Sequence, residues 1–190
     1  MAMSNNLKNI LKKFIFLFIL SIFSASLSFA DVMEFEFGTY SGESFFGRPH
    51  GRGEFAWNEG DSFSGQWVHG SREGRGKQIF EDGSILVGMY KDDLPNGKGK
   101  FTFTNGNVYV GNFKDGLFDG KGTLTYADTG GVFAGEFKKD KRTGEGTMTL
   151  ADGTTLTGMY VNDAGEGVHI ATYEDGTTEE LLLKNGELVE

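Results

Sequence analysis

Basic side chains recur at one fixed place in four successive segments of this chain. The residue between two paired glycines is Arg52, Arg75, Lys98 and Lys121, and in the middle two segments Lys77 and Lys100 follow two residues later. A row of cations of this kind has the chemistry to bind a phosphate or a carboxylate. Alternatively, the cations pair across strands with acids such as Glu43 and Glu54, which contributes about 0.2 to 1 kcal/mol per pair. The residues alone leave both interpretations open.

Residue types that carry catalysis or bind metals do not recur in this way. The chain has no cysteine, and its histidines, His50, His69 and His169, fall in different parts of different segments, as surface residues usually do. His50 is expected to make a loop hydrogen bond. The Gly-x-Gly pairs lead into strands, whereas a phosphate-binding glycine loop leads into a helix. We therefore expect no catalytic residue, no metal site and no cofactor, and hence no enzyme.

Six copies of a 23-residue pattern organise the chain from residue 40 onward. They begin at Tyr40, Phe63, Leu86, Tyr109, Phe133 and Leu156. Two residues later stand Gly42, Gly65, Gly88, Gly111, Gly135 and Gly158, and two after those Ser44, Trp67, Tyr90, Phe113, Phe137 and Tyr160. The paired glycines are Gly51/Gly53, Gly74/Gly76, Gly97/Gly99, Gly120/Gly122 and Gly144/Gly146. Such a period predicts a quasi-linear array of repeated units.

Each copy alternates small or apolar residues with polar ones, which is typical of a strand with one covered face. We predict an all-β fold, an elongated single-sheet antiparallel meander of about six 23-residue β-hairpin repeats. A polar loop such as Lys114 to Asp119 is expected to join the two strands of a hairpin, and an Asp-Gly turn to lead to the next. Strands lie about 4.8 Å apart, so rings can cover glycines on the neighbouring strand. The basic row then lies on the face opposite the rings.

The two ends of the chain differ from the repeats. Residues 1–30 have the layout of a signal peptide, with three lysines before the apolar run Phe14 to Phe23 and small residues before Asp31. An uncleaved anchor is the alternative, although that run has ten residues and a spanning helix needs about 20. Residues 31–39 are expected to supply a capping strand, from Met33 to Phe37, residues 40–178 the array, and residues 179–190 a half-repeat cap.

The leader also bears on localisation and partners. We expect export to the periplasm or beyond, with membrane tethering if the leader is retained. Its removal changes the formal charge of the chain from −9 to −12, because it carries three lysines and no acid. Such an acidic protein is a poor partner for nucleic acid, whose binding depends on neutralising phosphates.

The repeats resemble a known family. The segments from Phe63 to Trp67 with Gly74-Arg-Gly76, and from Tyr109 to Phe113 with Gly120-Lys-Gly122, are similar to MORN (membrane occupation and recognition nexus) repeats over about residues 40 to 176. Departures from the pattern are Ser44, Leu86, Leu156, Asp93, Asp140 and Asp163. The resemblance implies a non-catalytic module that binds proteins or self-associates, and some members are linked to phospholipids. We expect an exported scaffold for protein interaction or assembly; the alternative is an envelope-associated module for phospholipid headgroups or cell-wall glycan.

Overall fold

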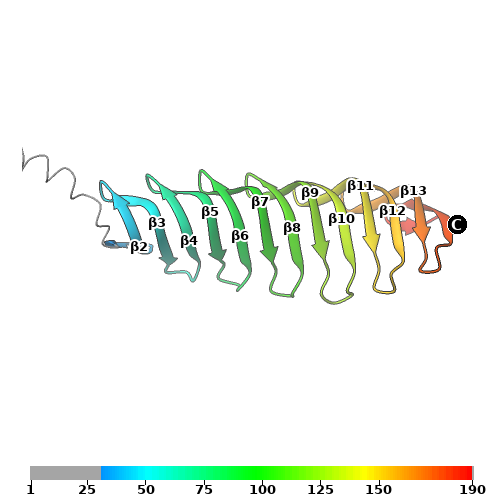
Figure 1. The fold of residues 1–190 in the computed structure, drawn as a ribbon, viewed down its shortest axis with the longest axis horizontal. Coiled ribbons are helices and arrows are strands. Elements are labelled where there is room, and N and C mark those ends of the chain that lie inside the picture. The colour runs from blue at the N-terminus through cyan, green and yellow to red at the C-terminus, as the bar shows by residue number, and fades with distance from the viewer. Residues whose placement is uncertain (1–30, 190) are drawn as a thin grey trace, which may run out of the picture.

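The fold is one long sheet in which neighbours in sequence are neighbours in space. The computed structural model describes residues 31–189, which form a 15-stranded antiparallel sheet ordered from β1 to β15 without a crossover. Figure 1 shows the hairpins side by side along an elongated molecule. The predicted all-β meander is therefore confirmed. Residues 31–189 contain no helix able to span a membrane, and the predicted signal peptide lies outside this range.

The strands follow one another at short intervals. They are β1 Asp31–Phe35, β2 Gly38–Phe45, β3 Arg48–Trp57, β4 Ser62–Val68, β5 Ser71–Ile79, β6 Ile85–Lys91, β7 Leu94–Thr102, β8 Val108–Lys114, β9 Leu117–Thr125, β10 Val132–Lys138, β11 Lys141–Thr149, β12 Thr155–Val161, β13 Ala164–Thr172, β14 Thr178–Lys184 and β15 Glu187–Leu188.

A two-residue turn joins the strands within each hairpin, so the predicted polar loop from Lys114 to Asp119 was wrong. β8 continues to Lys114 and β9 starts at Leu117, which leaves Asp115 and Gly116 as the turn. Their φ angles are 50° and 88°. Positive φ at both residues gives the turn a twist that matches that of the flanking strands, so the pairing runs to the last strand residue.

A longer turn joins one hairpin to the next, and the Asp-Gly signals lie there as expected. Between β5 and β6, the Phe80 N–H donates to the Ser84 carbonyl at 2.9 Å. Gly83 takes a φ of 87°, and Asp82 accepts the Ser84 N–H at 2.8 Å. The aspartate closes the turn with its side chain, while the glycine supplies a backbone conformation that other residues adopt at a cost.

The two glycines of each Gly-x-Gly pair have different roles. The first takes positive φ, as in Gly74 at 64°, beside a register shift such as that between Gly65 and Gln66. This glycine therefore belongs to a β-bulge, which bends the strand. The second lies beneath a ring: a Cβ on Gly76 would stand 2.2 Å from Cζ of Phe63. Only the second role was predicted from the sequence.

The core is the expected ladder of rings over glycines. Tyr40, Phe63, Tyr109 and Phe133 have no exposed surface, and they cover Gly53, Gly76, Gly122 and Gly146 respectively. The aromatic residues two positions beyond the first-strand glycines join the same cluster, and they are Trp67, Tyr90, Phe113, Phe137 and Tyr160. Edge-on contacts dominate, as between Phe63 and Tyr90, whose ring centroids are 4.9 Å apart.

His169 departs from the expectation that the histidines lie on the surface. It is completely buried, and a Cβ on Gly158 would stand 2.5 Å from its ring. It occupies the position that a second paired glycine holds in earlier repeats, while Leu156 holds the position of the usual ring. The ring in this hairpin therefore comes from the opposite strand, and it still covers the glycine.

The ends are also clearer in the structure. The first strand runs over Asp31–Phe35, not from Met33 to Phe37 as predicted, because Glu36 and Phe37 form the turn into β2. At the other end, β15 pairs with β14 through Leu183 and Lys184. The last hairpin is therefore short, and it leaves the rest of β14 as the edge of the sheet.

Candidate functional site

Alternation along the strands gives the sheet two unlike faces. The ring face carries the aromatic ladder, and the outer face carries the residues between paired glycines. On the ring face, one position at the start of each second strand recurs beside the tight turns: Pro49, Arg72, Pro95, Phe118, Arg142 and Gly165. The carbonyl of each accepts an N–H from the next tight turn, as Arg72 does from Asp93 at 3.2 Å. These bonds tie successive hairpins together at one edge.

Arg72 closes the ring face near the N-terminal end. Asp93 Oδ1 accepts the Arg72 N–H at 2.8 Å and lies 3.3 Å from its Nε, and Nη2 donates to the Asp93 carbonyl at 2.6 Å. The guanidinium also lies 5.6 Å from the ring centroids of Phe63 and Tyr90. The arginine is therefore held by a carboxylate on one side and aromatic rings on the other.

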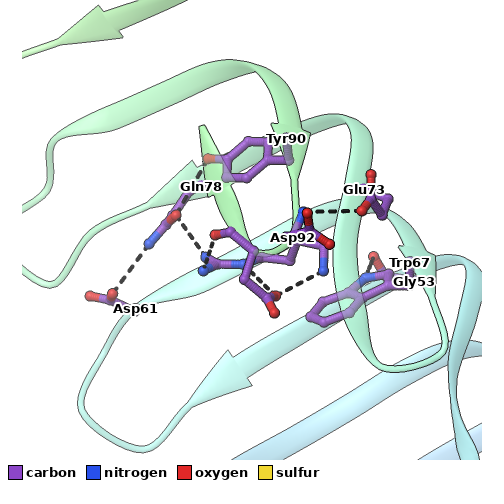
Figure 2. Close-up of polar contacts among 9 residues, drawn as sticks. Gly53, Asp61, Trp67, Glu73, Gln78, Tyr90 and Asp92 are labelled. Atoms are coloured by element: carbon purple, nitrogen blue, oxygen red, sulfur yellow. Dashed lines mark hydrogen bonds and ion pairs between the residues drawn. The ribbon is translucent and has the colours of Figure 1, made fainter. Parts of the chain in front are cut away.

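Gln78 extends this network across the face. Its Oε1 accepts from Arg72 Nη1 at 3.0 Å and from the Tyr90 hydroxyl at 3.3 Å, and its Nε2 donates to Asp61 at 3.4 Å. Figure 2 shows Gln78 between Tyr90 and Asp61. Burial raises the pKa of Tyr90, so its hydroxyl remains a protonated donor at neutral pH. The buried polar groups here are thus paired with one another.

Arg142, at the start of β11, repeats the arrangement three hairpins after Arg72. Its Nε lies 3.5 Å from Asp163 Oδ1, which also accepts the Arg142 N–H at 2.8 Å. The guanidinium lies 5.3 Å from the ring centroid of Phe133 and 5.4 Å from that of Tyr160. Arg72–Asp93 and Arg142–Asp163 are therefore two versions of one arginine–aspartate pair, each joining one hairpin to the next.

Between these two pairs, the arginine position holds Pro95 and then Phe118. Asp140 still accepts the Phe118 N–H at 2.7 Å, as Asp93 and Asp163 do for their arginines. The Phe118 side chain instead stacks on Tyr109, with centroids 3.7 Å apart and an interplanar angle of 11°. Asp140 therefore keeps the backbone half of the arrangement without the guanidinium.

An open groove of about 430 Å³ lies in this interval of the ring face. Its walls come from strands β6 to β10, from the turns before and after them, and from the turn between β12 and β13. They are Phe80, Leu86, Pro95, Phe101, Phe103, Phe113, Gly116, Phe118, Leu124, Phe137, Asp140 and Asp163. The space is present because the turn side carries the short residues Pro95 and Gly116, and because Leu86 replaces the usual ring. The result is an apolar floor with two carboxylates at one rim, which we call the aromatic groove.

Sequence reasoning missed the aspartates of this groove, although a signal was present. Asp93, Asp140 and Asp163 stood out as replacements for a turn glycine, and they keep positive φ angles of 69°, 69° and 75°. Each arginine–aspartate pair is separated by 21 residues. This repeated spacing links an aspartate that replaces the turn glycine in one copy to an arginine in the preceding copy.

The predicted basic residues all lie exposed on the outer face. Across the strands Arg75 is opposite Met89, and Lys77 and Lys100 flank Val87. Glu54 lies opposite Ser41 and Ser64, not opposite a cation. Lys121 is opposite Glu136, yet within residues 31–189 none of the six cations forms an ion pair. The structure thus brings the residues into one basic row in which, among the described residues, only Lys121 has an acid directly opposite it.

The histidines offer little metal-binding geometry. His50 makes the expected loop hydrogen bond, in which its Nδ1 accepts the His69 N–H at 3.4 Å. Among the described residues, no three His, Asp or Glu side chains gather as a metal site would require.

A solved domain shares this fold at low sequence identity. The TCP10 domain of Danio rerio CPAP matches with a TM-score of 0.52 and 16% identity, over 80% of this chain and 73% of that one. The same domain in complex with a peptide of Danio rerio STIL matches with a TM-score of 0.49 and 15% identity, over 80% of this chain and 66%, just under two thirds, of that one. No curated protein matches the chain.

The family model agrees with the repeat seen in the sheet. The MORN repeat model matches residues 40–62, 63–85, 87–108, 109–130 and 133–155, which make up more than half of the chain. The chain belongs to the MORN repeat family.

Proposed function

We propose that this protein is an exported, non-enzymatic MORN scaffold that holds a segment of a partner protein in the aromatic groove. One observation carries the proposal: the ring face is covered by Arg72 and Arg142 on either side, but between them aromatic and aliphatic residues remain partly exposed. Exposed apolar surface of this kind, rimmed by charges, is typical of interaction sites. MORN repeats are generally binding modules, which supports the proposal.

The rigidity of the sheet favours such a role. Every described strand is paired with its neighbours, and the tight turns are tied from hairpin to hairpin by backbone hydrogen bonds. A groove built on paired strands loses little conformational freedom when a partner binds. The apolar contacts, at about 25 cal/mol per Å² of buried surface, then contribute to affinity with a small ordering cost.

Pro95→Arg tests the groove with a residue that the fold already accepts at this position. Arg72 and Arg142 stand at the equivalent places. Residue 116 is a glycine where Asp93 and Asp163 hold those arginines, so an arginine at 95 is expected to lie over the rings and fill the space without a carboxylate partner. We expect the wild-type protein to capture envelope proteins that the Pro95→Arg variant fails to capture, while circular dichroism shows that the variant keeps the fold. Arg75→Glu on the outer face is the matched control. Capture that is lost with Arg75→Glu and retained with Pro95→Arg contradicts the proposal.

Export is proposed from the leader and has its own test. Mature protein recovered from the envelope or the medium should begin at Asp31. An N-terminal sequence that retains Met1 in the membrane fraction supports a tethered scaffold instead, and protein confined to the cytoplasm refutes export.

A second candidate function uses the basic row. Six exposed cations that form no ion pair with any described residue favour a phosphate-bearing or carboxylated ligand, such as phospholipid headgroups or cell-wall glycan. Binding to anionic vesicles should fall steeply as salt rises, because exposed charges are screened within about 10 Å at 0.1 M ionic strength. The double variant Arg75→Glu/Lys98→Glu should abolish it. Unchanged binding of vesicles and glycan by that variant removes this candidate.

A further inference from the structure

We propose that the partner segment places an arginine against Asp140, with large apolar side chains on either side of it. This inference rests on the proposed function and specifies its ligand. Two arginines of the chain, Arg72 and Arg142, bind an aspartate on the ring face. Asp140 holds the equivalent turn position, but the residue at the arginine position of its pair is Phe118.

The two internal pairs show what such a contact requires. In both, an aspartate at the second position of a tight turn accepts a backbone N–H from the preceding hairpin at 2.8 Å, and its side chain lies within 3.5 Å of a guanidinium Nε. In both, the guanidinium carbon lies 5.3 to 5.6 Å from aromatic ring centroids. The same geometry in two separate hairpins indicates that the ring face and the turn together form a receptor for arginine.

Asp140 keeps the turn half of this receptor without the cation, while the Phe118 side chain covers the ring half by stacking on Tyr109. It accepts the Phe118 N–H at 2.7 Å, and its φ of 69° equals that of Asp93. Within residues 31–189 it takes part in no ion pair, whereas Asp163 at the same rim is paired with Arg142 and nearby Asp119 with Lys138 at 3.1 Å. Asp140 is thus the carboxylate of the groove rim that a partner's cation would neutralise.

The surroundings select arginine over lysine. The Phe118 ring lies at the groove wall, stacked on Tyr109 beneath it. A planar guanidinium can stack on such a ring while its fork bonds a carboxylate, which a lysine ammonium cannot reproduce. Beside this position the floor is formed by Phe101, Phe113 and Leu124, where only apolar side chains would be favourable. The expected ligand is therefore an extended or helical segment in which an arginine is flanked by aromatic or aliphatic residues.

The experiment is a selection of random phage-displayed peptides on the full protein, followed by affinity measurements with synthetic copies. Asp140→Asn removes the carboxylate charge and should weaken binding about ten-fold or more, because a hydrogen bond to an ionised group is stronger than one between neutral groups. Glu145→Gln removes one charge from the outer face and should change nothing. Replacing the peptide arginine by lysine or alanine should cost as much as Asp140→Asn does.

Phe118→Arg provides an independent test that does not remove the carboxylate. It places an arginine where Arg72 and Arg142 stand in their hairpins, so the chain supplies its own cation to Asp140. Peptide binding should be lost while the melting temperature shows that the protein remains folded. Binding retained by this folded variant overturns the inference.

The remaining outcomes separate this inference from the proposed function. Peptides that bind wild type but not Pro95→Arg, yet lack arginine or ignore Asp140→Asn, keep the groove as a docking site and overturn the arginine contact. If every selected peptide binds the Pro95→Arg variant as tightly as the wild type, both the groove and the arginine contact are refuted.

Discussion

A methyl group added at Gly76 should destabilise the protein because the ring above it has no room to move. The new Cβ would stand 2.2 Å from Cζ and 2.3 Å from Cε2 of Phe63, whereas carbon atoms normally approach to about 3.5 Å. Phe63 is fully buried, and its ring contacts Trp67 and Tyr90 edge-on at centroid distances of 5.3 and 4.9 Å. Relief of the clash therefore requires several rings to shift together.

The size of the effect is the balance of two terms. Overpacking a core by one methyl group costs about 1 to 3 kcal/mol, and replacing a glycine by alanine reduces the entropy of the unfolded chain by about 0.4 to 1 kcal/mol in the opposite direction. Gly76→Ala should thus lower the free energy of unfolding by roughly 1 to 2 kcal/mol. Gly99→Ala is the matched control, because that glycine holds the same position one repeat later.

The control should be milder for a structural reason. Repeat three has Leu86 in place of the covering ring, and the nearest atom to a Cβ on Gly99 is Cε2 of Phe113, at 2.9 Å. Phe113 lines the aromatic groove, so it can yield into open space. Its displacement by a few tenths of an ångström relieves most of the contact.

Urea denaturation followed by tryptophan fluorescence measures both variants, because Trp67 lies against Phe63. Phe63→Leu copies the leucine of repeat three and should partly rescue Gly76→Ala, with a coupling energy of about 1 kcal/mol in a double-mutant cycle. The reasoning is refuted if Gly76→Ala costs no more than Gly99→Ala, or if the effects of Phe63→Leu and Gly76→Ala are simply additive.

Three other changes test the ring face. Burial raises the pKa of Tyr109 to about 12, so the folded state keeps a proton that the unfolded chain loses above pH 10; stability should fall between pH 10 and 12 by on the order of 1.4 kcal/mol per pH unit. Tyr109→Phe should make this fall shallower in urea titrations, and an unchanged slope would falsify the assignment. His169→Gly should lower the free energy of unfolding by about 2 to 4 kcal/mol, because it opens a cavity, and amide exchange in β12 and β13 should become faster. Adding Leu156→Phe should restore protection from exchange. If protection is not recovered, the covering ring is not interchangeable between the two strands. Arg72→Lys keeps the charge but loses the planar guanidinium, and should lower the free energy of unfolding in urea by about 1 to 2 kcal/mol. If the outer-face change Arg52→Lys lowers it equally, the pair of Arg72 with Asp93 does not contribute to stability.

The sequence by itself determined the meander and the ring ladder. A 23-residue period with alternating residues requires successive hairpins, and a glycine repeated beside a ring requires that the ring covers it, because a single sheet offers no second layer to bury the ring. These are local relations between neighbouring strands. The register of a hairpin therefore fixes them wherever the repeat holds, as at Tyr109 and Gly122.

Only the tertiary structure decided which positions of the ring face are closed and which are open. The contact of Arg72 with Asp93 joins two hairpins across 21 residues of sequence, and the repeat does not reveal that Phe118 interrupts the series before Asp140. The same holds for the buried His169, whose ring reaches Gly158 from the opposite strand. The directions of these side chains, and the space left by Leu86 and Pro95, depend on packing between repeats that differ from one another. A periodic pattern describes only what the repeats have in common, so it does not predict these features.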